Sequence, residues 1–142
     1  ITLPAIERKK RIAETVRALG ELTGGAKNSN YLTDLTPKFI VAAVLSVANH
    51  IFMDAVKASD GSLTIDSDIL GEVVQDYHDS FLSPIFVGLR KGFFEDGEHA
   101  KVSAMQEFPL KTSQGASKLE VKFGTPKQVI EAIADFLQKM EL

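Results

Sequence analysis

Residues 24–47, GGAKNSNYLTDLTPKFIVAAVLSV, join a polar loop with a single lysine directly to the most apolar and β-branched run of the chain. Pro37 fixes its own φ and lacks an N–H, so regular strand pairing is expected to begin after it. Residues 39–45 show no polar alternation, which is typical of a strand covered on both faces. We therefore predict a strand over 39–45, central in a sheet, that holds the preceding loop in place.

The loop carries groups that suit a sugar-phosphate backbone. Gly24 and Gly25 permit positive φ and a close approach of main-chain N–H groups to an anion. Lys27 adds a cation, and Asn28 and Ser29 add neutral hydrogen-bonding groups. The order helix, loop, strand is the reverse of a nucleotide-binding P-loop, so a nucleotide triphosphatase is excluded. An ordinary helix-to-strand connection is the alternative interpretation.

Composition indicates one globular domain. The chain has 142 residues, of which 44% are hydrophobic, enough to bury a core. No apolar run approaches the ~20 residues that span a bilayer, and no secretory signal is visible. The absence of cysteine excludes disulfides, thiolate zinc sites and cysteine nucleophiles. We expect a cytoplasmic location without a membrane partner.

Positive charge gathers in the first quarter of the chain. Residues 1–38 hold seven basic and four acidic side chains, a balance of +3, whereas the whole chain carries −3. A local basic surface can attract phosphate whatever the global sign. The alternative is a solvated helix face, because Glu7 with Arg11 and Glu14 with Arg17 have intrahelical spacing.

The remaining pattern predicts interleaved helices and strands. A helix is expected over 4–20, with an apolar stripe of Ala5, Ile12, Val16 and Leu19. Residues 51–56 and 63–65 are expected to form a hairpin around residues 60–61, an Asp-Gly pair. The next helix should be capped by Asp66, Ser67 or Asp68 and end near residue 83, before a proline.

The second half is predicted to end in a strongly marked helix. A short helix is expected over 85–94, a turn over 95–98, a strand over 102–108, an exposed loop over 109–118 and a strand over 119–123. Thr125 as N-cap, Pro126 at the first position and Gln128 as the capping-box partner begin the last helix. The predicted class is α+β, with helices packed on a small, largely antiparallel sheet.

No catalytic constellation is visible. His50, His78 and His99 belong to no known metal or triad motif. Asp76, His78 and Asp79 would not share one helix face, and the phenylalanines are expected in the core rather than as stacking platforms. We expect no catalytic residue, no metal and no cofactor. Two alternatives stay open. One is a metal-dependent nuclease whose carboxylates form no recognisable sequence motif. The other is a small α+β interaction or regulatory module that oligomerises through a sheet edge.

The succession of elements resembles a known family. It comprises the basic helix segment ERKKRI at 7–12, the glycine-containing loop, the strand after Pro37, a long helical stretch, a further strand and the closing helix QVIEAIADFLQKM at 128–140. Together these resemble the C-terminal half of the DevR-type CRISPR autoregulator family, within the RAMP superfamily. Such proteins are the CRISPR RNA-binding backbone subunits of Cascade-like type I complexes. The resemblance covers residues 6–142.

This resemblance implies a part of an RRM-like, ferredoxin-like palm that polymerises along CRISPR RNA without cutting it and supports target DNA recognition in antiviral defence. The implied partners are CRISPR RNA, target DNA through the guide, copies of the chain, other Cascade subunits and an N-terminal half of the palm. Family members are about twice as long, so residues 1–142 form either a single domain or the C-terminal half of such a subunit. The RNA-binding residues implied are Gly24, Gly25, Ala26, Lys27, Asn28 and Ser29, with Lys38, Arg8 and Arg11 as weaker candidates.

Overall fold

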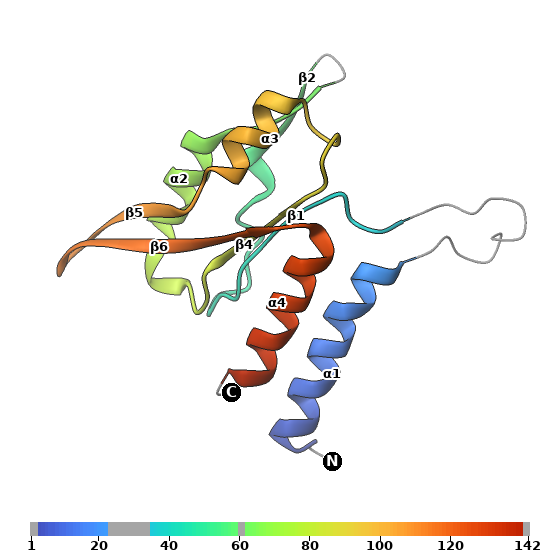
Figure 1. Cartoon of the computed structure of the whole chain (residues 1–142). Coiled ribbons are helices and arrows are strands. Elements are labelled where there is room, and N and C mark those ends of the chain that lie inside the picture. Colours follow the sequence, from blue (N-terminus) through green and yellow to red (C-terminus); the bar gives the residue numbers. More distant parts are fainter. Residues whose placement is uncertain (1–2, 23–34, 60–61, 141–142) are drawn as a thin grey trace, which may run out of the picture.

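The computed structural model describes residues 3–22, 35–59 and 62–140, and its main sheet is built around one buried strand. This strand, β4 (Ile85–Leu89), is buried along its whole length. It lies between β1 (Phe39–Ala42) and β6 (Gly115–Gly124), and β5 (Glu107–Thr112) completes the order β1-β4-β6-β5 (Figure 1). The β1–β4 and β5–β6 pairs are antiparallel, and the central β4–β6 pair is parallel, so the sheet is mixed.

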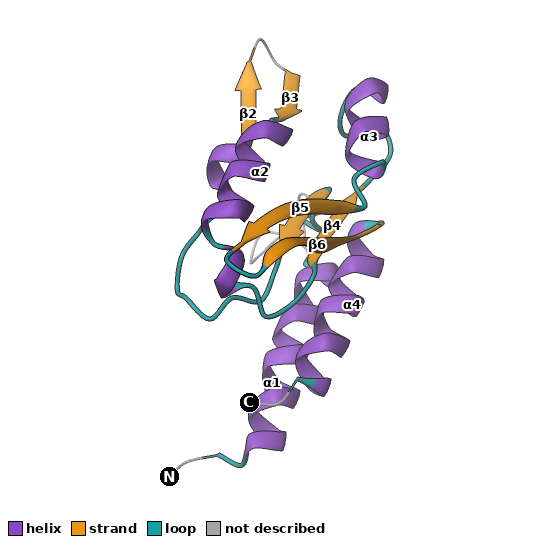
Figure 2. Cartoon of the chain, turned by 90° about the vertical axis from the view of Figure 1, so that its left-hand side faces the viewer, coloured by secondary structure: helices purple, strands orange, loops and turns teal. Residues whose placement is uncertain are grey.

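Helices cover both faces of this sheet, as Figure 2 shows. Alternate residues of β4 face opposite sides because side chains alternate along a strand. Ile85, Val87 and Leu89 pack with residues of α2 (Ser67–Asp76) and α3 (Asp96–Ser103). Phe86 packs on the other side against α4 (Pro126–Lys139). The α+β class predicted from the sequence is confirmed. The α4 side of the sheet is only partly covered, because Glu107, Lys118 and Glu120 of β5 and β6 are exposed there.

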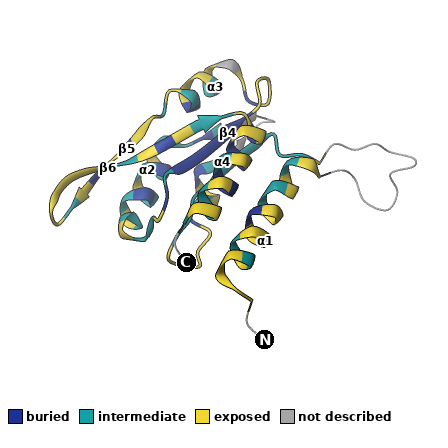
Figure 3. Ribbon diagram, turned by 60° about the horizontal axis from the view of Figure 1, so that its bottom comes forward, coloured by how far each residue is buried: buried dark blue, intermediate teal, exposed yellow. Residues whose placement is uncertain are grey.

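The first helix, α1 (Ala5–Ala18), packs on α4 rather than on the sheet. Its fully buried residue is the small Ala13, and Val16 packs half-buried against the cluster of Phe86, Val129 and Ile133. Arg17 donates to Glu131 at 2.9 Å and to Asp135 at 2.8 Å, which ties the two helices together. Of the apolar stripe predicted for this helix, Ala5, Ile12 and Leu19 are exposed, and only Val16 packs against its neighbour (Figure 3). The predicted register of the buried face is therefore wrong.

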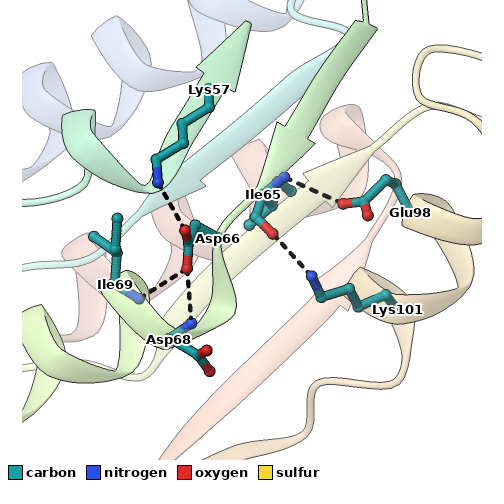
Figure 4. Close-up of polar contacts among 7 residues, drawn as sticks. All are labelled: Lys57, Ile65, Asp66, Asp68, Ile69, Glu98 and Lys101. Atoms are coloured by element: carbon teal, nitrogen blue, oxygen red, sulfur yellow. Dashed lines mark hydrogen bonds and ion pairs between the residues drawn. The ribbon is translucent and has the colours of Figure 1, made fainter. Parts of the chain in front are cut away.

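A small hairpin, β2 (Val56–Ser59) with β3 (Ser62–Ile65), is tied to two helices by side chains (Figure 4). Asp66 is the N-cap of α2 and accepts the N–H groups of Asp68 and Ile69, while Lys57 donates to it at 2.8 Å. Glu98 and Lys101, one turn apart on α3, satisfy the N–H and C=O of Ile65. The predicted hairpin and cap are confirmed, although residues 60–61 lie outside the described residues and 51–55 form no strand. Single-turn 3-10 helices lie at Leu19–Glu21, Met53–Ala55 and His78–Ser80.

Two predictions about the sheet centre are wrong. The run expected to be a helix over 85–94 contains β4, and the strand expected at the centre, β1, lies at an edge. A short, continuously apolar run has no periodicity that distinguishes a buried helix from a buried strand. Alternate residues of the 39–45 run pack in the two core clusters on opposite sides of the sheet, so an edge strand is also covered on both faces.

The region 95–118 also differs from prediction. Residues 96–103 form α3, so the predicted turn at 95–98 and a strand beginning at Val102 are wrong. Residues 109–118 belong to a continuous β5–β6 hairpin, in which Thr112 and Gly115 form the pair next to the turn. The predicted loop is therefore wrong as well. Gly115 has φ of 119°, which only glycine adopts readily, and this turn residue was hidden among the other loop signals. Pro109 is tolerated because β5 is an edge strand.

The last helix begins as predicted. Gln128 N–H donates to the Thr125 hydroxyl at 3.3 Å, and Thr125 N–H donates to the Gln128 side chain at 2.9 Å. This reciprocal capping box follows from local chemistry alone, which is why the sequence predicts it well. Val129, Ile130 and Ile133 form the buried face of the helix.

Candidate nucleic-acid interface

Basic side chains gather at one end of the sheet. The carboxyl ends of the parallel strands β4 and β6 meet there, and Arg90 and Lys91 directly follow β4. Lys127 lies in the first turn of α4, which follows β6. The start of β1 lies at the same end, because Arg90 N–H donates to the carbonyl oxygen of Lys38 at 2.9 Å. We call Lys38, Arg90, Lys91 and Lys127 the basic rim.

Two neighbouring clefts confirm that the rim residues lie together. A small one, of about 80 Å³, is lined by both Arg90 and Lys127, with Gly20 and Thr36 beside them. A larger one, of about 470 Å³, shares Arg90 with it. We call the larger one the rim cleft; its polar border includes Arg90, Lys91 and His99, and its apolar wall is formed by Leu89, Phe123 and Pro126.

Four cations outside the rim are engaged by carboxylates. Arg11, Arg17, Lys57 and Lys118 each pair with carboxylates, and a hydrogen bond from Lys118 to Glu107 raises the pKa of that lysine. Exposed Arg90, Lys91 and Lys127, in contrast, form no ion pair with any carboxylate that the structure describes. Their charge is therefore available to an external anion.

Lys127 is the least free of these three. On its far side it borders a third cleft, of about 360 Å³, together with Glu14, Glu21 and Glu131. These carboxylates reduce the positive potential around Lys127. Arg90 and Lys91 are thus the stronger anion-binding candidates.

The N-terminus of α4 contributes little by itself. Pro126 has no N–H, and the N–H of Gln128 is engaged by Thr125. The first turn therefore leaves only the Lys127 N–H for a ligand, whereas a good helix-terminus anion site offers several. An anion at this end must be held mainly by side-chain cations.

The sequence-predicted residues fall into three groups. Lys38 lies in the basic rim. Arg8 and Arg11 lie in the first half of α1, and the helix rise places Arg11 about 13 Å along the axis from Gly20, which lines the small cleft from the 3-10 turn after α1. Arg11 also pairs with Glu7 at 2.9 Å, which lowers the pKa of that carboxyl.

The third group, Gly24, Gly25, Ala26, Lys27, Asn28 and Ser29, lies outside the described residues. Its nearest described neighbours are informative. Leu35 N–H donates to the carbonyl oxygen of Leu22 at 3.2 Å, so the chain leaves and returns at one place. Gly20 and Thr36, just beyond this pair, line the small cleft with Arg90.

Sequence reasoning missed Arg90, Lys91 and Lys127. Their signal was an Arg-Lys-Gly run after apolar residues 85–89 and a Gly-Thr-Pro-Lys run between a strand and a helix. The two runs come together only because β4 and β6 are parallel neighbours, and a predicted helix over 85–94 does not place them side by side. Phe93, in the turn after Lys91, is 41% exposed, so its predicted place in the core is wrong. The adjacent Phe94 is buried, as predicted.

Comparisons with known proteins add no family to this picture. No family model, no curated protein and no solved structure matches the chain. The residues that the structure describes hold no group of three or more acidic or histidine side chains placed to bind a metal ion. None of the helices among them is both long and apolar enough to cross a bilayer.

Proposed function

We propose that the chain is a non-catalytic subunit that binds single-stranded RNA by its phosphate backbone, through the basic rim and through residues 24–29, which the sequence alone nominates. The observation that carries the proposal is the uncompensated charge of Arg90 and Lys91 at the carboxyl ends of two parallel strands. Ligands of sheets with parallel strands commonly bind beyond these ends. Sequence-independent affinity for nucleic acid comes from such cation–phosphate contacts.

The packing of the helices supports backbone binding over base reading on a sheet surface. RRM-type domains stack bases on aromatic residues of an open sheet face. Here α2 and α3 lie on one face and α1 and α4 near the other (Figure 2). The part of the second face that stays exposed, over β5 and β6, carries Glu107, Lys118 and Glu120 and no aromatic side chain among the described residues. We therefore place the RNA strand across the end of the sheet, at Arg90 and Lys91.

Within this class, we propose the particular role of a CRISPR RNA-binding backbone subunit of a type I, Cascade-like complex in antiviral defence. The support is the resemblance of residues 6–142 to that family, together with the position of Lys38 in the basic rim. Polymerisation along the guide RNA, pairing with target DNA through the guide, the partner subunits and a cytoplasmic location belong to this proposal.

The test is the binding of a fluorescein-labelled, ~30-nucleotide single-stranded RNA, followed by anisotropy over a KCl series. For single strands, log K falls with log salt at a slope of about −0.7 per phosphate contacted. The double variant Arg90→Ala/Lys91→Ala should bind more weakly and flatten the slope by about 1.4, because two contacts are lost.

A matched control removes two cations away from the rim. Lys111→Ala/Lys139→Ala changes the net charge equally, at β5 and at the far end of α4, and should leave the slope unchanged. Arg8→Ala/Arg11→Ala tests the contribution of α1 separately. Equal salt slopes for the rim variant and the control would contradict the proposal. Cleavage of the RNA on adding Mg²⁺ or Mn²⁺ would favour a nuclease instead.

A second function, an interaction module that assembles through a sheet edge, is favoured by one observation. The outward backbone groups at the two edges of the sheet differ in their hydrogen-bond partners. On β5, Pro109 removes one outward N–H, and the Gln75 side chain bonds both the N–H and C=O of Lys111. On β1, the alternation of the ladder directs the backbone groups of Phe39, Val41 and Ala43 outward, and none of them has a partner within the described residues. The β1 edge is therefore open to another strand.

A further inference from the structure

The rim cleft combines features that phosphate binding alone does not require. Its volume of about 470 Å³ lies within the range of small-molecule clefts, roughly 300–1,000 Å³. A phosphate backbone needs only an exposed cationic surface. This cleft instead has an apolar wall, with buried Leu89 and half-buried Phe123, and cations only at its border.

The apolar wall is aromatic on one side. The rings of His99 and Phe123 meet edge to face, with centroids 6.0 Å apart and planes at 90°. Aromatic rings favour contact with flat, polarisable groups in stacked or edge-to-face geometry. A flat ligand with an apolar body and a negatively charged group fits this lining and border.

A side-chain amide with unused donors lines the same cleft. Gln128 lines it, and its side-chain oxygen is fixed by the N–H of Thr125 at 2.9 Å. That bond assigns the oxygen of the amide and leaves both Nε2 hydrogens without a partner among the described residues. The free donors can reach a carbonyl or ring nitrogen at the edge of a base.

We propose that the rim cleft is a subsite for one nucleotide. The base lies against Phe123, Gln128 Nε2 donates to its edge, and Arg90 with Lys91 holds its phosphate. As a subsite of RNA this rests on the proposed function, and it gives that function one base-binding position beside a backbone track. The same chemistry would accept a free mononucleotide, and the experiment separates the two sources.

The decisive variant is Gln128→Glu, because glutamate also completes a capping box at this position and so preserves the start of α4. It replaces the two donors by a carboxylate oxygen. Gln138→Glu, an exposed position near the other end of α4, makes the same chemical change away from the cleft. Thermal unfolding of both variants should match that of the parent chain.

The readout is the ratio of affinities for a ~30-nucleotide RNA and for an abasic ribose-phosphate strand of equal length. This ratio cancels the general repulsion that an added carboxylate exerts on any phosphate backbone. For the parent chain we expect about tenfold tighter binding of the RNA with bases, in line with the contribution of one stacked base. Gln128→Glu should lower the ratio, because a carboxylate in place of the two donors faces the acceptor groups at the base edge, and Gln138→Glu should not change it.

Each outcome bears on one proposal or the other. A ratio near one in the parent chain, or a ratio unchanged by Gln128→Glu, would overturn the base subsite and leave backbone binding intact. If neither strand binds, the proposed function fails, and UMP titrated into ¹⁵N-labelled protein decides the subsite alone. Shifts confined to the amides of Lys91, His99, Gly124 and Gln128 would then support a free-nucleotide site, and their absence would overturn it.

Discussion

Gly88 illustrates how one missing side chain sets the distance between two layers. An added Cβ would lie 2.6 Å from Cγ2 of Ile40 and 2.8 Å from Cα of Pro126, both closer than non-bonded carbons approach. The absence of a side chain therefore lets the start of α4, and with it Lys127, pack directly on β4. No conformational requirement is involved, because the φ of Gly88 is not positive.

Gly88→Ala should lower the free energy of unfolding by about 1–3 kcal/mol, as overpacking in a filled core does. Gly71→Ala is the matched control, since its Cβ would be 4.0 Å from the nearest side chain and it lies within α2. That change should stabilise the protein by about 0.4–1 kcal/mol. Urea unfolding measures both, and a Gly88→Ala variant as stable as the parent would refute the close approach.

At the scale of elements, Asp66 links the hairpin to α2. A hydrogen bond from Lys57, followed by the N–H groups of Ile69 and Asp68, lowers the pKa of this carboxyl below its usual value of 3.8. A depressed pKa in the folded state means that the ionised form stabilises the fold. That stabilisation is complete above the unfolded-state pKa and is lost as the pH falls through the lower, folded-state value.

Asp66→Asn should reduce this acid sensitivity, because asparagine still caps a helix but does not titrate. Melting temperatures measured from pH 6 down to pH 2.5 should fall less steeply for the variant than for the parent chain. Other carboxylates, such as Glu7, contribute equally to both proteins and cancel in the comparison. Parallel curves would mean that Asp66 is not ion-paired in solution.

The elements predicted correctly from the sequence are those specified by neighbouring residues. Thr125 and Gln128 cap α4 by a contact three residues apart, and Asp66 caps α2 in the same way. The β4 strand depends instead on β1 and β6, which come from distant parts of the chain, and no local pattern distinguishes it from a helix. The basic rim was missed for the same reason, since its members come from three segments that meet only in the sheet. Lys38 was foreseen because it adjoins the loop.

At the scale of the whole molecule, the unequal sheet edges predict how copies would associate. If the chain assembles through strand addition, the open β1 edge should be used and the β5 edge, closed by Pro109 and Gln75, should not. Val41→Pro removes an outward N–H on β1 at a position where an edge strand tolerates proline. We expect this variant to lose self-association in sedimentation velocity while retaining the parent's circular dichroism. Association that survives the substitution would place the contact elsewhere.

The parallel pairing of β4 with β6 and the packing of α1 on α4 have a consequence for the order of folding. Thr112 and Gly115 can pair as soon as the short turn between them closes, but Phe39 must wait for Leu89, and Arg17 for Glu131. Long-range contacts of this kind form late, because the closure entropy of the intervening chain must be overcome first. During synthesis, the first helix and first strand would therefore emerge well before their partners. For that interval, the nascent chain would expose the apolar 39–45 run to chaperones and to other chains.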